Sequence, residues 1–493
     1  MGVGVAIGLL LPLQVSAVPI SSTDAEALST PAESLEPKLR DILLRATRAL
    51  MDSRFEDAES LAREILAEHP DAPDALQILG YALANLKQYD EAISVLDKSA
   101  DRYERNAGPL VVKGEILRFR GQREQSRQAF ERALEIEPDN LRALENLGKM
   151  AIDDGEVERA IGYFETAARQ LAPRELGVKP RLAELYFRTG QVERVQQLLA
   201  PWSDLPEGTP DRVIAMLARA AAEQNERAAS RGYFEARLRR APSLEAYVDF
   251  GTFHRNGLDF AKAERVFKQA ADRYPDSAVP WVELGRTYGG EGRYEAALDA
   301  FNRGLEIAPG NVSLLKGVRL AQFRLGQLDA AQAVALRLAS RQDAEPSDHV
   351  WLGSIERTRG NVDTAIAAYH SALEADPENW VALNNLAELL TKRDPDQAVA
   401  LARQAVDVAG HVAAARDTLA WALFRSGDVS AARDMYAELT ADAPEYAIAA
   451  YHYGRVLIAI GRSAEGRAEL LRALELDNGF RYAEDARARL KNQ

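Results

Sequence analysis

The chain has 493 residues, and its 61 Lys and Arg against 75 Asp and Glu leave a net charge of −14. This acidic balance opposes binding to nucleic acid or to anionic lipid surfaces, so we expect no nucleic-acid partner. The chain contains no cysteine, which excludes disulfides, thiolate metal sites and a cysteine nucleophile.

The first residues predict export. Residues 3–13 form an apolar run, and Val15-Ser16-Ala17 places small residues at the −3 and −1 positions of a signal-peptidase site. These features indicate a signal peptide over residues 1–17 and a periplasmic or otherwise exported protein. The first ten residues lack Lys and Arg, which departs from the usual signal. An uncleaved membrane anchor and a cytosolic protein with a frayed terminus are the alternatives.

Residues 18–37 are rich in Ser, Thr, Pro, Ala and Glu and show no helical period, so we expect a flexible tether. A pattern that returns every 34 residues follows the tether. A fixed period of this length predicts a solenoid, because each unit must stack on its neighbours to bury its apolar face. The clearest copy contains Gly285, Tyr288, Ala297, Phe301, Gly304 and Pro309.

Each period predicts a pair of helices. In the clearest copy, apolar residues with helical spacing occur in residues 279–289 and 294–307, and Gly292 separates the two stretches. Small residues at Gly285 and Ala297 allow the two helices to approach closely. Leu at either position should overpack this contact, at a cost of about 1 to 3 kcal/mol.

The pattern resembles the tetratricopeptide repeat, whose unit favours Trp, Leu, Gly and Tyr on its first helix and Ala, Phe, Ala and Pro on its second. The copy that starts at Ala278 matches seven of these eight slots, and Gly304 takes the remaining one. The resemblance covers residues 39 to 480. It implies an all-α fold, an α-solenoid formed by a right-handed superhelix of about 13 helix-turn-helix units.

One unit departs from the pattern. It starts at Leu176 and runs into residues 201–210, which contain three prolines. We expect a hinge there, between an N-terminal repeat block at 38–200 and a C-terminal block at 211–479; a merely degenerate unit is the alternative. Residues 480–493 should form a capping helix on the last unit.

No constellation for catalysis is present in the sequence. The six histidines are scattered without metal-ligand spacing, and no phosphate-binding loop or nucleophile elbow occurs. Paired carboxylates such as Asp153-Asp154 lie between predicted helices, where acidic residues cap helix starts. We therefore predict a protein that is not an enzyme and has no cofactor and no metal site.

Members of the tetratricopeptide repeat family usually bind ligands along a concave face lined by first helices, and the resemblance assigns such a groove to the last three units. Packing against the adjacent helix is the alternative for the aromatic residues of this set. The chaperone-binding Lys/Asn pattern of the family is not reproduced, since Lys316 is followed by Leu320 where Asn is needed. The predicted partner-binding residues are Asn384, Asn385, Glu388, Asp417, Trp421, Phe424, Arg425, Tyr451, His452 and Arg455.

Residues 379–387, 417–421 and 451–454 are similar to the end of exported tetratricopeptide repeat proteins of exosortase and exopolysaccharide secretion systems. The resemblance implies a non-catalytic scaffold in the bacterial cell envelope that binds protein partners or an extended peptide. Many of those proteins are lipoproteins, whereas this chain has no cysteine to acylate. The alternatives are an accessory of an envelope enzyme that binds or positions a polysaccharide, and a cytosolic assembly factor.

Overall fold

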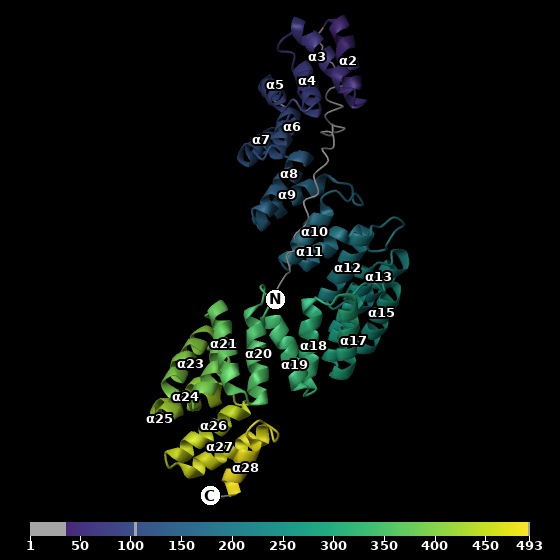
Figure 1. Ribbon diagram of the computed structural model, residues 1–493. Coiled ribbons are helices and arrows are strands. Elements are labelled where there is room, and N and C mark those ends of the chain that lie inside the picture. Colours follow the sequence, from purple (N-terminus) through teal and green to yellow (C-terminus); the bar gives the residue numbers. More distant parts are fainter. Residues whose placement is uncertain (1–35, 103–105, 492–493) are drawn as a thin grey trace. The chain divides into compact units, whose positions relative to one another are not determined.

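The computed structural model describes residues 36–102 and 106–491. These residues form 27 α-helices in paired antiparallel packing (Figure 1), which confirms the all-α solenoid of helix pairs. Within this part of the chain, no helix combines the length and apolar character needed to cross a membrane. The predicted signal peptide, at 1–17, and all but the end of the predicted tether, at 18–37, lie outside the described residues.

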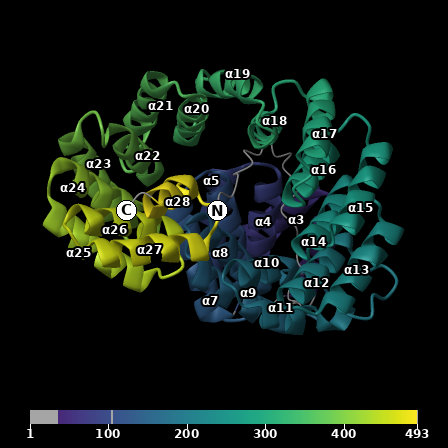
Figure 2. The ribbon, with the colours of Figure 1, turned by 90° about the horizontal axis from the view of Figure 1, so that it is seen from below.

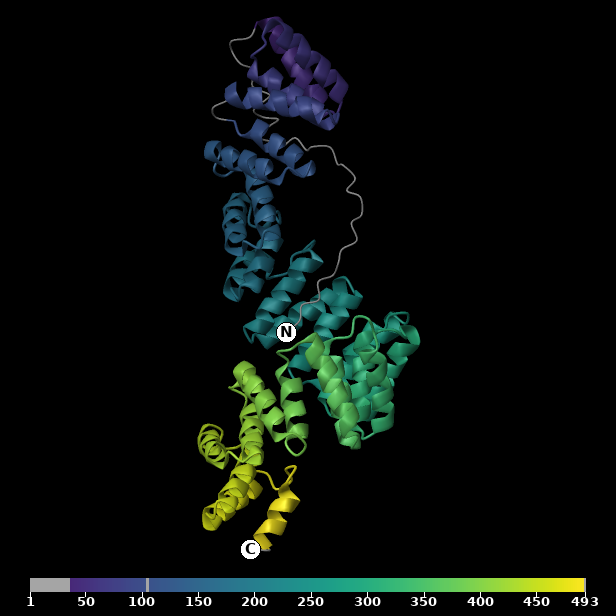
Figure 3. The same cartoon turned by 60° about the vertical axis from the view of Figure 1, so that its left-hand side comes forward.

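The chain divides into two compact units, and the first ends at Ala241. Its helix pairs follow one another in chain order, from purple to teal in Figure 3. The helices of the first unit are α2 (Pro37–Met51), α3 (Phe55–Glu68), α4 (Pro73–Asn85), α5 (Tyr89–Arg102), α6 (Gly108–Phe119), α7 (Arg123–Ile136), α8 (Leu141–Asp153), α9 (Val157–Gln170), α10 (Lys179–Arg188), α11 (Val192–Leu199), α12 (Asp211–Glu223) and α13 (Arg227–Arg240).

The second unit starts at Pro242. It is a curved row of helix pairs, and Figure 2 shows α14 and α22 on the inner side of this row, with α15 and α23 outside. Its helices are α14 (Leu244–Asn256), α15 (Phe260–Arg273), α16 (Val279–Gly290), α17 (Tyr294–Ile307), α18 (Val312–Arg324), α19 (Leu328–Ala339), α20 (Pro346–Arg359), α21 (Val362–Ala375), α22 (Trp380–Leu390), α23 (Pro395–Ala409), α24 (Ala413–Ser426), α25 (Val429–Asp442), α26 (Ala447–Ala459), α27 (Ser463–Leu476) and α28 (Ala483–Lys491).

The pair α16 and α17 shows how the repeat sequence builds this fold. Gly292 has φ +81°, a left-handed conformation that ends α16, and the next amide, of Arg293, donates to the carbonyl oxygen of Tyr288 at 2.9 Å. A Cβ on Gly285 would lie 2.3 Å from the Phe301 ring of α17. The helices therefore approach as closely as the small residue allows, as predicted.

The fifth pair is shorter than the others, since α11 has eight residues. After it, residues 200–202 form a 3-10 turn, η1 (Ala200–Trp202), whose Trp202 side chain is buried. Trp202 shares a hydrophobic cluster with Val213 and Met216 of α12, which joins the fifth and sixth pairs across the proline-rich segment. Along the sequence, the boundary between the compact units follows Ala241, one repeat after the predicted one, and a hinge at 201–210 stays a prediction.

The carboxyl-terminal helix follows the last repeat at the predicted place, but it begins at Ala483 and not at residue 480. Ala483 and Ala486 are buried against Tyr451 and Leu470 of the last pair, together with Phe480. Residues 480–482 precede the helix, so helical spacing does not determine the directions of their side chains. Two of them contribute to the site described next.

Candidate functional site: a pocket on three first helices

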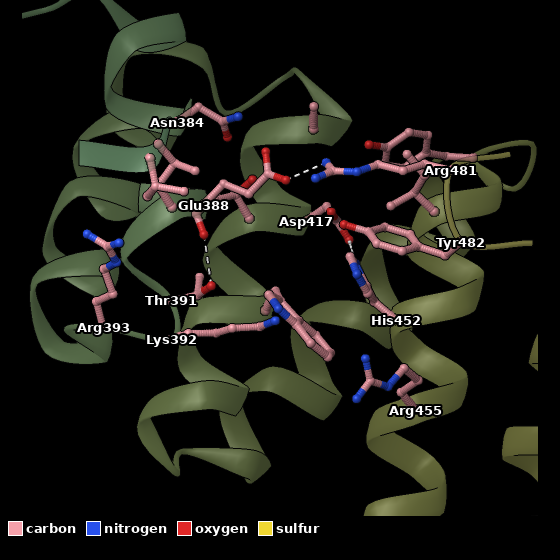
Figure 4. A pocket seen from close by; sticks show the side chains of 17 residues that line it. Asn384, Glu388, Thr391, Lys392, Arg393, Asp417, His452, Arg455, Arg481 and Tyr482 are labelled. Atoms are coloured by element: carbon pink, nitrogen blue, oxygen red, sulfur yellow. Dashed lines mark hydrogen bonds and ion pairs between the residues drawn. The ribbon is translucent and has the colours of Figure 1, made fainter. Parts of the chain in front are cut away.

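A pocket of about 470 Å³ lies on the first helices of the last three repeats, α22, α24 and α26. Figure 4 shows its charged and polar side chains converging from these helices and from the segment before α28. We call it the α22–α26 pocket. Its polar and aromatic lining includes Asn384, Glu388, Lys392, Arg393, Asp417, Trp421, Tyr446, His452, Arg455, Arg481 and Tyr482.

Helix geometry explains why these residues converge. Asn384 and Glu388 are four residues apart on α22, and Asp417 and Trp421 are four residues apart on α24, so each pair occupies one face of its helix. The start of α22 is fixed by Asn379, whose side-chain oxygen accepts from an amide of the first turn at 3.1 Å. The repeat then places equivalent faces of successive first helices side by side.

Asp417 is the centre of a buried polar network. It is 6% exposed, and its Oδ1 lies 2.8 Å from Nδ1 of His452, which is 5% exposed. The hydroxyl of Tyr436, from α25, donates to the Asp417 carbonyl oxygen at 3.1 Å and to its Oδ1 at 3.2 Å. Burial, and then the Asp417 charge, raises the pKa of Tyr436 well above its ordinary value. These bonds satisfy the buried carboxylate and fix its orientation.

Glu388 links three parts of the second unit. Its Oε2 accepts from Nη1 of Arg357, on α20, at 2.7 Å, and its Oε1 pairs with Arg481. Figure 4 shows Arg481 reaching toward Glu388 from the segment before α28. The end of the chain therefore closes one side of the pocket.

The aromatic side chains of the pocket are stacked on protein groups. The Trp421 ring stacks on His452 with centroids 4.3 Å apart, and the Arg455 guanidinium lies 4.8 Å from the Trp421 ring centroid. Tyr482 stacks on Tyr451 at 4.8 Å, with the two planes 10° apart. These contacts hold the rings in place and occupy ring surface that a ligand would otherwise use.

The structure brings six of the residues proposed from the sequence to this pocket: Asn384, Glu388, Asp417, Trp421, His452 and Arg455. Asn385, Phe424, Arg425 and Tyr451 do not line it. Tyr451 is 1% exposed because residues 480–482 and α28 cover it, and Phe424 packs beside Trp421. These two side chains thus pack against other side chains of the protein, and Trp421 stacks on His452 of the adjacent first helix, as the packing alternative expects. That the pocket binds a partner stays a prediction.

The sequence reasoning missed Lys392 and Arg393, which follow α22, as well as Tyr446, Arg481 and Tyr482. The run Phe480-Arg481-Tyr482 carried a signal, since two aromatics around an arginine are unusual in a merely solvating cap. Within the described residues, Asn384 Oδ1 is buried without a hydrogen bond, and exposed Lys392 has no ion pair. Lys392 is therefore open to a ligand, and Asn384 Oδ1 is an acceptor that the protein leaves unpaired.

The fold and the pocket define a class of protein, a helical-repeat solenoid with a polar and aromatic pocket on its first helices. Comparison with known families agrees with this class. Two models of the tetratricopeptide repeat together match more than half of the chain, at residues 49–107, 111–175, 258–319, 320–379, 351–410 and 418–479. The chain belongs to the tetratricopeptide repeat family.

Individual relatives match parts of the chain. Cellulose synthase operon protein C of Pseudomonas fluorescens (strain SBW25) is 32% identical over 149 residues, which are 28% of this chain and 12% of that protein. Tetratricopeptide repeat protein 21A of Mus musculus is 20% identical over 335 residues, which are 66% of this chain and 22% of that protein. The chain thus spans less than a quarter of each. In the solved Cut9–Hcn1 structure, a chain with 15% identity aligns over 96% of this chain and 99% of its own length, with a TM-score of 0.42.

Proposed function

We propose that this protein is a non-catalytic scaffold that holds an extended segment of a protein partner in the α22–α26 pocket. The observation that carries the proposal is the pocket's combination of a fixed lining and two unpartnered polar groups, Asn384 Oδ1 and Lys392. An amide acceptor and a cation suit a peptide, whose backbone donates hydrogen bonds and whose side chains carry charge. The Asp417 network holds the lining in place before the partner arrives.

A polysaccharide is the second candidate for this pocket, and the aromatic contacts disfavour it. A sugar ring needs a free aromatic face to stack on. His452 and Arg455 both contact the Trp421 ring, and Tyr482 stacks on Tyr451. Within the described residues, Tyr446 is the lining aromatic without a ring contact, and a single ring makes a poor platform for an extended glycan.

We further propose that the scaffold works in the bacterial cell envelope, in a complex that makes or exports a polysaccharide. Two observations support this placement. One is the export signal read from residues 1–17, and the other is the 32% identity to a protein named for a cellulose synthase operon. Sequencing the amino terminus of the protein purified from its own cells tests export. A mature chain that begins at Val18 is expected, and a cytosolic chain that retains residues 1–17 would refute it.

Site-specific photocrosslinking tests the peptide pocket. A photoreactive amino acid replaces Lys392 at the pocket, or Arg403 on the exposed outer side of α23 as the matched control. Irradiation of living cells followed by mass spectrometry should yield a protein crosslinked at 392 and absent at 403. Equal yields at the two positions, or crosslinks to polysaccharide alone, would overturn the proposal.

A further inference from the structure

A second pocket, of about 530 Å³, lies on α16, α18 and α20 of the same compact unit. None of its lining residues belongs to the α22–α26 pocket. Its side chains occupy the same repeat slots that line the α22–α26 pocket, since Lys316 of α18 corresponds to Asn384 and Leu320 to Glu388. We call it the α16–α20 pocket. The repeat therefore provides two separate recesses on its first helices.

The lining of the α16–α20 pocket carries cations and no Asp or Glu. Arg286, Lys316 and Arg319 contribute to it. Two carboxylates outside the lining each pair with two cations. Glu283 forms ion pairs with Arg286, at 2.8 Å, and with Arg255. Asp348 forms ion pairs with Arg319, at 2.9 Å, and with Lys316, at 3.7 Å.

The three cations of the lining have three carboxylate partners, and none of these carboxylates lines the pocket. Exposed Glu345 is a further partner of Lys316, at 3.0 Å, and Glu283 is shared with Arg255, which lies outside the lining. Asp348 also accepts from a backbone amide of the α20 capping box, so it has little capacity left for the cations. A ligand carboxylate inside the pocket would meet these cations without facing a carboxylate of the lining.

Arg319 provides an independent observation. Its side chain is 4% exposed, its guanidinium lies 4.9 Å from the Trp351 ring centroid, and its Nε has no hydrogen-bond partner in the described structure. A buried guanidinium donor without an acceptor is unusual, because folded proteins pair nearly all buried polar atoms. An oxygen atom of a bound anion would supply the missing acceptor.

The rest of the pocket is apolar and open. Leu320 is 38% exposed although it lines the pocket, and Trp351 forms part of the wall. A Cβ placed on Gly289 would meet no atom within 4 Å, so this glycine leaves space. The lining suits an apolar side chain beside an anionic one.

We propose that the α16–α20 pocket binds an acidic side chain, Asp or Glu, next to an apolar side chain in an extended segment of a partner protein. The partner's carboxylate would lie between Lys316 and Arg319, and its apolar neighbour would contact Leu320 and Trp351. The proposal deepens the proposed function, since the ligand is again a partner segment. It is tested separately, because it concerns different residues.

The test measures binding of three short peptides to the full-length protein labelled with fluorotryptophan. The peptides are Ac-Ala-Leu-Asp-Leu-Ala-amide, the same peptide with Asn for Asp, and the Asn peptide with a free carboxyl terminus. The Trp351 fluorine resonance, assigned with Trp351→Phe, reports binding. We expect saturable shifts with the Asp peptide, about tenfold weaker affinity for the Asn amide, and weaker binding as salt is raised.

Two variants and one control locate the site. Lys316→Gln should weaken the Asp peptide about tenfold, and Gly289→Leu should block it by filling the open space. Gly232→Leu, on α13 of the first unit, also meets no atom within 4 Å and should leave binding unchanged. Circular dichroism and the thermal midpoint check that each variant is folded.

The possible results separate clearly. No shift with the Asp peptide, equal binding of the Asp and Asn amides, or full binding to folded Gly289→Leu would overturn the proposal. If the Asn peptide with a free carboxyl terminus bound more tightly than the Asp amide, the choice of an internal acidic side chain would be wrong. None of these results depends on crosslinking at residue 392, so failure of the α22–α26 pocket is a distinct outcome.

Discussion

Adding a single methyl group at Gly285 should reveal the close helix contact on which each repeat depends. The Phe301 ring is buried between two glycines from flanking helices. A Cβ on Gly285 would lie 2.3 Å from the ring, and a Cβ on Gly317 would lie 2.6 Å from it. Real Cβ atoms do not approach a ring so closely, so Gly285→Ala forces the ring or a helix to move.

The expected magnitude follows from two opposing effects. Alanine raises helix propensity by about 1 kcal/mol relative to glycine, while overpacking a core costs about 1 to 3 kcal/mol. Gly285→Ala should therefore destabilise the α16–α18 region by up to about 2 kcal/mol. Gly289→Ala on the same helix meets no atom within 4 Å and should stabilise it by about 0.5 to 1 kcal/mol.

The background Phe301→Ala isolates the cause. This change alone should cost about 3 to 5 kcal/mol, because it removes a buried aromatic ring. Once the ring is absent, Gly285→Ala should become neutral or stabilising, which gives a coupling energy of at least about 1 kcal/mol. Native-state hydrogen exchange of the α16–α18 amides measures these local free energies in the full chain. Additive effects, within about 0.5 kcal/mol, would refute the reasoning.

Three further changes have defined expectations. Burial raises the pKa of Asp74 from 3.8 to about 6, so its contribution to stability is complete below about pH 4 and is lost as the pH rises through 6. Asp74→Asn should therefore gain about 1 to 3 kcal/mol over the wild type at pH 8 and almost nothing at pH 4, measured by urea unfolding. Tyr436→Phe removes the hydroxyl that donates to Asp417 and should lower the local free energy of α24–α26 by about 1 to 2 kcal/mol in hydrogen exchange. Asp211→Ala takes the carboxylate from Arg237, which is 1% exposed, and should cost about 3 kcal/mol in urea unfolding.

Matched controls accompany these variants. Tyr453, whose ring stacks beside Tyr436, has a hydroxyl without a hydrogen bond in the described residues, so Tyr453→Phe should be nearly neutral. Asp434→Ala breaks an exposed ion pair with Arg433 and should cost at most about 0.5 kcal/mol. An Asp74→Asn gain of equal size at pH 4 and pH 8 would contradict the buried-carboxyl explanation.

The repeat period was sufficient to predict the fold because it encodes local contacts. The unit starts read at Ala278 and Leu176 lie one and three residues before the observed first helices α16 and α10. Gly292 ends α16 and Gly285 contacts Phe301 of α17, so the role of each can be predicted from the sequence of one repeat. The proline-rich segment was less readable, because Trp202 packs with α12 across its three prolines and that contact has no signature in the repeat.

The site was predictable where it follows helix register and not where it depends on the chain end. Asn384, Glu388, Asp417 and Trp421 could be proposed because their slots fall on one face of a first helix. Tyr451 occupies an equivalent slot but is covered by residues that follow the last repeat. Register alone cannot predict such a cover, since it arises from a segment outside the periodic pattern.

The ion pair between Arg481 and Glu388 joins residues 93 positions apart in the chain. In an array whose units contact only their neighbours, the terminal unit can fray alone. Here the segment after the last repeat reaches back past two whole units to α22. The Arg481–Glu388 pair therefore adds a contact among the last three units that is not between neighbours. Unfolding of the final unit would also break this ion pair and remove one side of the α22–α26 pocket, and because the pair is exposed it adds at most about 1 kcal/mol. Proteins trimmed before Arg481 would lose this contact while keeping every repeat, and their last unit would fray more readily.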